Sequence, residues 1–103
     1  MTRLERTIFD QFVQIESLAA LYYELRPKAS LPATRGWAGS PDFLRHIAGV
    51  AAKIGPEVIL ECSSGVSTIV LARTLQLRGS GRVISLEHDP KYAEITRDAL
   101  HNR

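Results

Sequence analysis

The order of hydrophobic patterns along the 103-residue chain predicts an α/β fold, in which two helices precede a β-α-β-α unit. Two segments with helical spacing fill the first half. In the second half, two short apolar runs alternate with helical segments. Such alternation implies parallel strands joined by right-handed crossovers, the beginning of a doubly wound sheet. We therefore expect a helical lead-in over residues 1–56 and the first half of a sheet domain over residues 57–103.

The first helix is predicted over residues 3–26, where Pro27 ends it. Its apolar residues recur at steps of three and four, which draws one stripe along the helix. The members of the stripe are Leu4, Ile8, Phe12, Ile15, Ala19, Tyr22 and Leu25. Two roles fit the stripe: packing on the rest of the domain, or pairing with another helix in a dimer.

The second helix is predicted to start after Ser40, which can act as its cap, and to end at Gly55-Pro56. Pro41 suits the first turn, and Asp42 faces the positive end of the helix dipole. The expected buried stripe consists of Phe43, Ile47, Val50, Ala51 and Ile54. Residues 28–39 form a connecting loop, in which Trp37 either fills the edge of the core or contacts a ligand.

The second half of the chain changes its hydrophobic period. Residues 58–60 are a continuous apolar run, typical of a strand buried on both faces of a parallel sheet. A helix is predicted over residues 66–77, a second strand over residues 82–86, and a last helix from Asp89-Pro90 toward residue 103. Asp89 is expected to cap that last helix.

Residues that carry chemistry lie where each predicted strand ends. The first strand runs into a loop of small residues around Gly65, where the backbone can approach a ligand closely. Glu87 follows the second strand, 22 residues after Gly65. In nucleotide-binding folds an acid at this place accepts hydrogen bonds from ribose hydroxyls. A carboxylate can hold a vicinal diol with two hydrogen bonds.

These two segments, residues 58–68 (VILECSSGVST) and 83–90 (VISLEHDP), resemble the first two motifs of class I S-adenosylmethionine-dependent methyltransferases. Residues 35–43 (RGWAGSPDF) are similar to the lead-in of a bacterial subgroup of that family. The resemblance covers much of residues 35–103. It implies a Rossmann-like parallel sheet, here truncated to β-α-β-α, with S-adenosylmethionine as the cofactor.

The resemblance also implies roles for particular residues. Glu61 matches the acid that orders the methionine end of the cofactor, Glu87 matches the ribose-binding acid, and His88 lies where a residue often contacts the adenine. The small positions of the loop are Ser63, Gly65 and Ser67, and Thr68 follows them. A glycine is usual at the position of Ser63, where a serine fits if its φ is negative. The hydroxyls of Ser67 and Thr68 can cap the helix or bind the ligand carboxylate.

Each candidate also has a purely structural interpretation. Glu87 can be a solvated acid at a strand end, Glu61 can bind nearby loop amides, and His88 can be an ordinary loop residue. Cys62 is expected to be a small buried filler, because no basic partner is spaced to activate it as a nucleophile. The other two histidines, His46 and His101, are expected to face solvent.

Two other functions compete with methyl transfer. A nicotinamide or flavin dinucleotide site would need G-x-G-x-x-G for its pyrophosphate, whereas this loop has one glycine and the acid Glu61. A carboxylate suits a cationic sulfonium better than a phosphate. The other competitor is a non-catalytic remnant or interaction module that binds a nucleoside weakly or not at all.

Length and composition limit the possible partners. Residues 57–103 have room for two strand–helix units, so we expect a fragment of the fold that lacks the acceptor site and associates through its open sheet edge or its first helix. The methyl acceptor cannot be inferred from the sequence.

A net charge of +2 without a run of like charges indicates no nucleic-acid partner. The single cysteine and the lack of a zinc-ligand pair predict no metal site. The sequence has no signal peptide and no apolar stretch of membrane-spanning length, so we expect a cytoplasmic protein.

Overall fold

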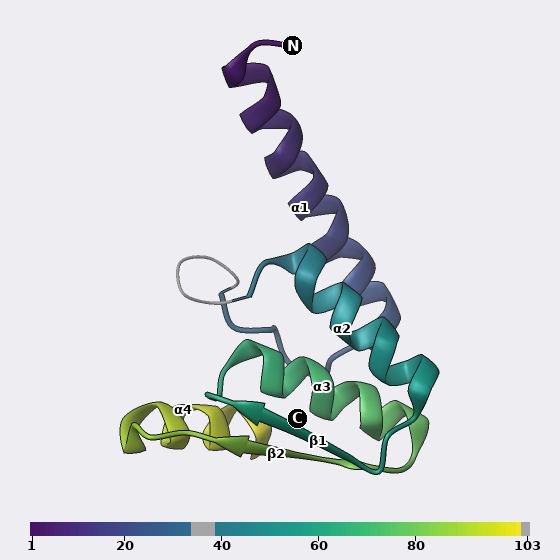
Figure 1. Cartoon of the computed structure of the whole chain (residues 1–103), viewed down its shortest axis with the longest axis vertical. Helices are drawn as coiled ribbons and strands as arrows, with labels where there is room; N and C mark the ends of the chain where they lie inside the picture. Colours follow the sequence, from purple (N-terminus) through teal and green to yellow (C-terminus); the bar gives the residue numbers. More distant parts are fainter. Residues whose placement is uncertain (34–38, 102–103) are drawn as a thin grey trace.

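The computed structural model describes residues 1–33 and 39–101, in which four helices accompany a two-stranded parallel sheet (Figure 1). The elements in chain order are α1 (Arg3–Leu25), α2 (Pro41–Ile54), β1 (Val58–Cys62), α3 (Val66–Arg78), β2 (Arg82–Leu86) and α4 (Pro90–His101). The predicted order of two helices and a β-α-β-α unit is therefore confirmed. The prediction for Trp37 lies outside the described residues.

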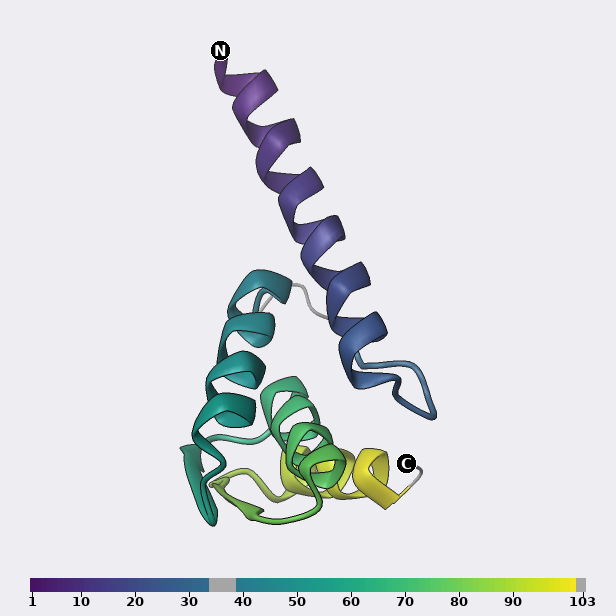
Figure 2. The same cartoon turned by 90° about the vertical axis from the view of Figure 1, so that its right-hand side faces the viewer.

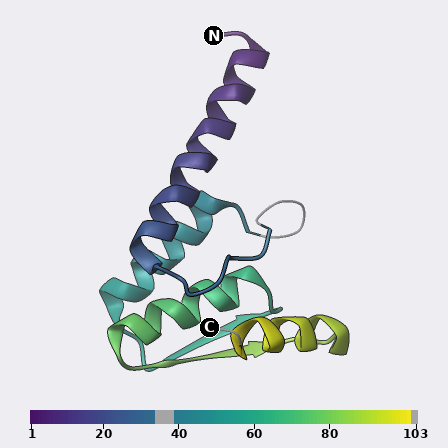
Figure 3. The ribbon, with the colours of Figure 1, turned by 180° about the vertical axis from the view of Figure 1, so that it is seen from behind.

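The two strands pair in parallel, from Val58 opposite Arg82 to Cys62 opposite Leu86. Both α3 and α4 lie on the same face of this sheet (Figures 1 and 3). On the other face the side chains are exposed, with Leu60 at 65% and Leu86 at 58%, because no element of the described chain covers it. The prediction that the first strand is buried on both faces is therefore wrong for the described structure.

Among the described residues, only the C-terminal half of α1 has side chains buried against the rest of the protein. Its buried residues Ser17, Leu21 and Leu25 recur every four positions, whereas its first half extends well beyond α2 (Figure 2). The predicted stripe lies largely on another side of the helix, so its first four members are exposed. These are Leu4, Ile8, Phe12 and Ile15. Packing on the domain is thus confirmed for Leu25 and wrong for those four residues, and helix pairing stays a prediction.

The 23-residue helix α1 is the longest helix in the structure. Neither α1 nor any other helix within the described ranges is both long and apolar enough to cross a membrane.

Helix α2 begins where the sequence predicts, with a different cap from the one expected. The Ser40 hydroxyl does not accept a backbone N–H; it donates to the Asp42 carboxylate at 2.6 Å. That carboxylate accepts the N–H of Phe43 at 2.8 Å, so Asp42 satisfies the first turn. Gly55, with φ 64, ends the helix in the left-handed conformation that glycine tolerates best.

The buried side of α2 differs from the predicted stripe. Leu44, Ala48 and Ala51 are buried against α1 and α3, and of these only Ala51 belongs to the predicted set. Phe43 and Ile54 are 52% and 69% exposed. Helix α2 is apolar on two adjacent sides, and its packing on α1 and α3 selects the side that carries Leu44.

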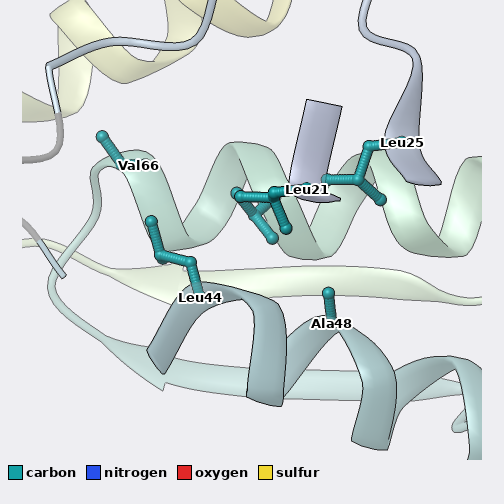
Figure 4. Packing of buried hydrophobic residues seen from close by; sticks show 6 residues of the cluster. Leu21, Leu25, Leu44, Ala48 and Val66 are labelled. Atoms are coloured by element: carbon teal, nitrogen blue, oxygen red, sulfur yellow. The ribbon is translucent and has the colours of Figure 1, made fainter. Parts of the chain in front are cut away.

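The hydrophobic core joins the helical lead-in to the sheet domain. Its buried members are Leu21, Leu25, Leu44, Ala48, Val66 and Val70, which come from α1, α2 and α3 (Figure 4). Helix α3 is the centre of this core, because it is buried around most of its circumference. The start of α3, and with it the loop that follows β1, is therefore fixed by packing.

Two arginines of α3 bind the C-terminal ends of the first two helices. Arg73 donates to the carbonyl oxygens of Leu25 and Arg26 at 2.8 and 2.9 Å. Arg78 donates to the carbonyl of Ala52 near the end of α2. A guanidinium at a helix C-terminus satisfies carbonyls without an intrahelical partner and interacts favourably with the helix dipole.

Gly81, which directly precedes β2, has to be a glycine. Its φ is 100, and a Cβ there would lie 2.6 Å from the carbonyl oxygen of Pro56. This close approach lets β2 start beside β1, and it sets the register in which Glu61 lies opposite Ser85.

Candidate functional site

The loop between β1 and α3 turns sharply at Ser63. The Ser63 N–H donates to the carbonyl of Leu86 at 2.7 Å, which extends the strand pairing by one residue. The φ of Ser63 is 78, in the left-handed region. The negative φ under which a serine was expected to fit is therefore not observed, because the chain must reverse immediately after β1. Glycine adopts this conformation at less cost, which gives a physical reason for glycine at this position.

Three hydroxyl groups hold the carboxylate of Glu61. Ser67 donates to Oε2 at 2.9 Å, Ser85 donates to Oε1 at 2.6 Å, and Thr68 also donates to Oε1. Within residues 1–33 and 39–101 no cationic side chain forms an ion pair with Glu61. The loop amides that the structural interpretation expected are not among the described partners of Glu61, whose donors are hydroxyls. No cation among the described residues neutralises its negative charge.

The hydroxyls of Thr68 and Ser67 bind groups of the protein itself. Thr68 is buried, and its hydroxyl accepts the N–H of Gly65 at 3.1 Å. It therefore caps the first turn of α3, which was one of the two roles expected for it. Ser67 is half-buried and bonded to Glu61. Nothing lies within 4 Å of the place where a Cβ on Gly65 would be, so the turn is open on that side.

Glu87 is bound to the loop and is nearly buried. Its Oε1 accepts the backbone N–H and the hydroxyl of Ser64, at 3.1 and 2.9 Å. Its Oε2 accepts the N–H of Asp89 at 3.4 Å, and its side chain is only 9% exposed. The interpretation of Glu87 as a solvated strand-end acid is therefore wrong. The two hydrogen bonds from Ser64 lower the pKa of the Glu87 carboxyl below its ordinary value, since they stabilise the ionised form.

The two residues after Glu87 behave differently from each other. The side chain of His88 is 95% exposed, and its Nδ1 lies 3.6 Å from Oε2 of Glu87. Its contact with adenine stays a prediction. Asp89 accepts the N–H of Lys91 at 2.9 Å, which confirms that it caps α4.

Two hollows adjoin the C-terminal end of β1. One, of about 440 Å³, is lined by Cys62, Ser63, Leu86, Glu87 and His88. The other, of about 590 Å³, lies between α2 and β1 and has Glu61 and Ser67 in its wall. Cys62 is exposed and lines both hollows, so the prediction of a buried filler is wrong. The structure therefore places Ser63, Glu87 and His88 at one hollow, and Glu61 with Ser67 at the other.

Comparisons of this chain with family models, curated proteins and solved structures found no match. The likeness of its motifs to methyltransferases therefore stays a prediction.

Three residues of the site were not identified from the sequence: Ser64, Ser85 and Thr96. The Ser85 hydroxyl also lies 2.8 Å from the carbonyl oxygen of Ser63, so its one proton is shared between that oxygen and Oε1 of Glu61. Thr96 donates to the hydroxyl of Ser64 at 3.2 Å. The register of two five-residue parallel strands could have paired Ser85 with Glu61. For Thr96 the sequence offers only its place inside the predicted last helix.

The other two histidines are exposed, as predicted. His101 lies at the end of α4, and His46 lies on α2, where it also lines the hollow between α2 and β1. Within the part of the chain that the structure describes, no three histidine, cysteine, aspartate or glutamate side chains gather to hold a metal ion.

Proposed function

We propose that the chain binds S-adenosylmethionine in a Rossmann-like half-sheet and serves methyl transfer of the class I methyltransferase type. The observation that carries this proposal is the pairing of Glu87 with Ser64. It brings the acid after β2 against the small-residue loop after β1, so that both line or flank one hollow. A nucleoside with two ribose hydroxyls suits an ionised, nearly buried carboxylate at this edge of a parallel sheet.

The residues of the site fit the cofactor in charge and in hydrogen-bonding capacity. A carboxylate has about four acceptor positions, and the described contacts of Glu87 leave capacity on Oε2 beside the hollow. Glu61 lines the neighbouring hollow between α2 and β1, where its carboxylate accepts hydrogen bonds from three hydroxyls and offers a negative charge to the ammonium and sulfonium groups of the methionine end. When bound, the cofactor supplies an electrophilic methyl group. The protein's contribution is to hold it in place, because methyl transfer depends largely on positioning.

The same loop is poorly suited to a pyrophosphate. The N–H groups of three successive residues are already engaged: Ser63 with Leu86, Ser64 with Glu87, and Gly65 with Thr68. A dinucleotide site needs such groups unpaired, to cradle its phosphates. Two carboxylates nearby add electrostatic repulsion. This hydrogen bonding supports S-adenosylmethionine over a nicotinamide or flavin dinucleotide.

Isothermal titration calorimetry on the 103-residue chain tests the proposal, with S-adenosylhomocysteine and NAD as the two ligands. We expect S-adenosylhomocysteine to bind and NAD to bind at least tenfold more weakly, a difference of about 1.4 kcal/mol. Tighter binding of NAD would overturn the proposal. So would the absence of any S-adenosylhomocysteine binding by a chain that melts cooperatively.

A pair of matched variants locates the binding site. Glu87→Gln keeps the shape of the side chain and removes its charge, and we expect it to weaken S-adenosylhomocysteine by roughly 10- to 100-fold, since hydrogen bonds to charged groups contribute about 1.5–3 kcal/mol. The control is Glu94→Gln, an exposed acid on α4 that should leave the affinity unchanged. Equal affinities of the two variants would place the ligand elsewhere.

A second candidate function is a non-catalytic interaction module. The observation that favours it is the exposed apolar surface, on the first half of α1 and on the uncovered face of the sheet. Such a module would self-associate through α1 or the open sheet edge. Light scattering during the same titration separates the two: a concentration-dependent mass with no ligand heat supports the module. A monomer that binds S-adenosylhomocysteine supports the first proposal.

A further inference from the structure

Ser64 connects three separate elements of the fold. It lies in the loop between β1 and α3, and both its N–H and its hydroxyl donate to the same oxygen, Oε1 of Glu87 after β2. Its hydroxyl oxygen accepts a hydrogen bond at 3.2 Å from the hydroxyl of Thr96 on α4. Thr96 is 7% exposed and Ser64 is half-buried, so this connection is largely shielded from solvent.

The direction of these hydrogen bonds is fixed by the number of protons. An ionised carboxylate only accepts, so the single hydroxyl proton of Ser64 is donated to Glu87. The Ser64 oxygen is then left to accept, and Thr96 supplies the donor. The result is a one-way relay from Thr96 through Ser64 to Oε1. Two donors on Oε1 leave Oε2 as the oxygen with spare acceptor capacity, apart from the long 3.4 Å contact with the N–H of Asp89.

We propose that Ser64 and Thr96 are positioning residues, whose relay holds the Glu87 carboxylate in one orientation with Oε1 saturated and Oε2 presented to ligand hydroxyls. This inference rests on the proposed function for the identity of the ligand. It changes the expected binding mode, since a ribose diol would be held at one oxygen of Glu87 and not across both. A loop hydroxyl and a helix hydroxyl thereby influence affinity without touching the ligand.

The surroundings of Glu87 make the relay testable by titration. The ionisable side chains beside it are His88, 3.6 Å from Oε2, and Asp89, whereas the loop and α4 contact it or Ser64 through neutral hydroxyls. Removing a hydroxyl therefore changes hydrogen bonding to Glu87 without removing a charge. The Ser64 N–H stays in place in any side-chain variant, so the loop keeps one of its two bonds to Oε1.

The first experiment is a carboxyl carbon NMR titration of Glu87 in the ligand-free chain. In Ser64→Ala we expect the pKa of Glu87 to rise toward its ordinary value of 4.5, because one donor to the ionised form is lost. Thr96→Val, which keeps the shape and loses the hydroxyl, should raise it by less, and Thr96→Ser should leave it unchanged. The matched control is Ser80→Ala, in the exposed turn before β2. An unchanged Glu87 titration in a cooperatively melting Ser64→Ala protein would overturn the relay.

The second experiment measures S-adenosylhomocysteine affinity of the same proteins. We expect Ser64→Ala to bind about tenfold more weakly and Ser64→Thr, which restores a hydroxyl, to recover most of the loss. If Ser64→Ala binds as tightly as the wild type, the positioning role is wrong even where the titration shifts. If no protein binds S-adenosylhomocysteine while the Glu87 titration still shifts, the proposed function fails and the relay stands.

Discussion

Replacement of Ser63 by glycine should make the protein more stable, which is unusual for a change beside a candidate binding site. Ser63 has a φ of 78, and its exposed hydroxyl makes no hydrogen bond within the described structure. The two hydrogen bonds that fix this residue use its backbone: its N–H donates to Leu86 at 2.7 Å, and its carbonyl accepts from Ser85 at 2.8 Å. Ser63→Gly keeps both bonds and relieves the strain of the left-handed conformation.

The magnitude follows from two opposing terms. A side-chain-bearing residue in the left-handed conformation costs about 1–2 kcal/mol. Glycine loses more conformational freedom on folding, which costs about 0.5–1 kcal/mol. The midpoints of these two ranges leave a net gain of about 0.75 kcal/mol, which raises Tm by roughly 3–6 °C for a domain of this length. The variant also removes a side chain from the wall of the hollow that Glu87 lines, so ligand access does not decrease.

Differential scanning calorimetry measures this shift, with Ser63→Ala as the matched control. Alanine removes the same hydroxyl but is as strained as serine in this conformation, so its Tm should stay near that of the wild type. A Tm of Ser63→Gly at or below the wild-type value would refute the reasoning. An equal rise in Ser63→Ala would do the same, because it would assign the effect to the hydroxyl.

Other expected outcomes concern the core, a helix end and acid stability. Leu44→Ala should lose about 2–5 kcal/mol in urea unfolding, because Leu44 is fully buried, whereas Phe43→Ala, at 52% exposure, should lose much less. Arg73→Ala should lose about 1–3 kcal/mol, since it leaves two carbonyls at the end of α1 without their donor, and the exposed Arg97→Ala is its control. The lowered pKa of Glu87 predicts a pH effect, because the unfolded chain takes up a proton before the folded one as the pH falls. The stability due to ionised Glu87 is therefore present above about pH 4.5 and lost as the pH falls through the lower folded value, and urea midpoints of Glu87→Gln should lack this part of the acid dependence.

Element boundaries were predictable because local residues determine them. Pro27 follows the end of α1, Gly55 ends α2 in a left-handed conformation, and Asp89 caps α4 through the N–H of Lys91. Each of these effects acts within one helical turn, so the sequence contains all the information that it needs. The parallel pairing of the strands followed in the same way from the helix between them.

The buried faces were not predictable in the same way. Helix α2 has apolar residues on two adjacent sides, and periodicity alone cannot choose between the side of Phe43 and that of Leu44. The choice depends on where α1 and α3 lie, which is a property of the assembled core. The stripe of α1 failed for two reasons. The first half of the helix extends well beyond α2 (Figure 2), and in the second half the described neighbours pack on the side with Leu21 and Leu25, which leaves Ile15 exposed.

For the candidate site, the sequence predicted where the two acids lie better than it predicted their hydrogen-bond partners. Glu61 lies near the C-terminal end of β1 and Glu87 follows β2, so their placement at the same end of the sheet could be expected, although they line different hollows. Their hydrogen-bond partners could not, because the contacts to Ser64 and Ser85 depend on the strand register and on the left-handed turn at Ser63.

The hydrogen bonding at this edge of the sheet also limits the ligands that it can take. Hydroxyl and N–H groups, and no lysine or arginine of the described chain, satisfy Glu61 and Glu87, so both acids keep a negative charge next to the hollows. The N–H groups of residues 63–65 are engaged within the protein, so these three do not offset that charge for an incoming phosphate. A ligand that combines hydroxyls with a positive charge meets both conditions, whereas a dinucleotide meets neither at its pyrophosphate. The preference between S-adenosylhomocysteine and NAD should therefore weaken when Glu61→Gln removes one of these charges. A preference that Glu61→Gln leaves unchanged would show that shape, and not charge, selects the ligand.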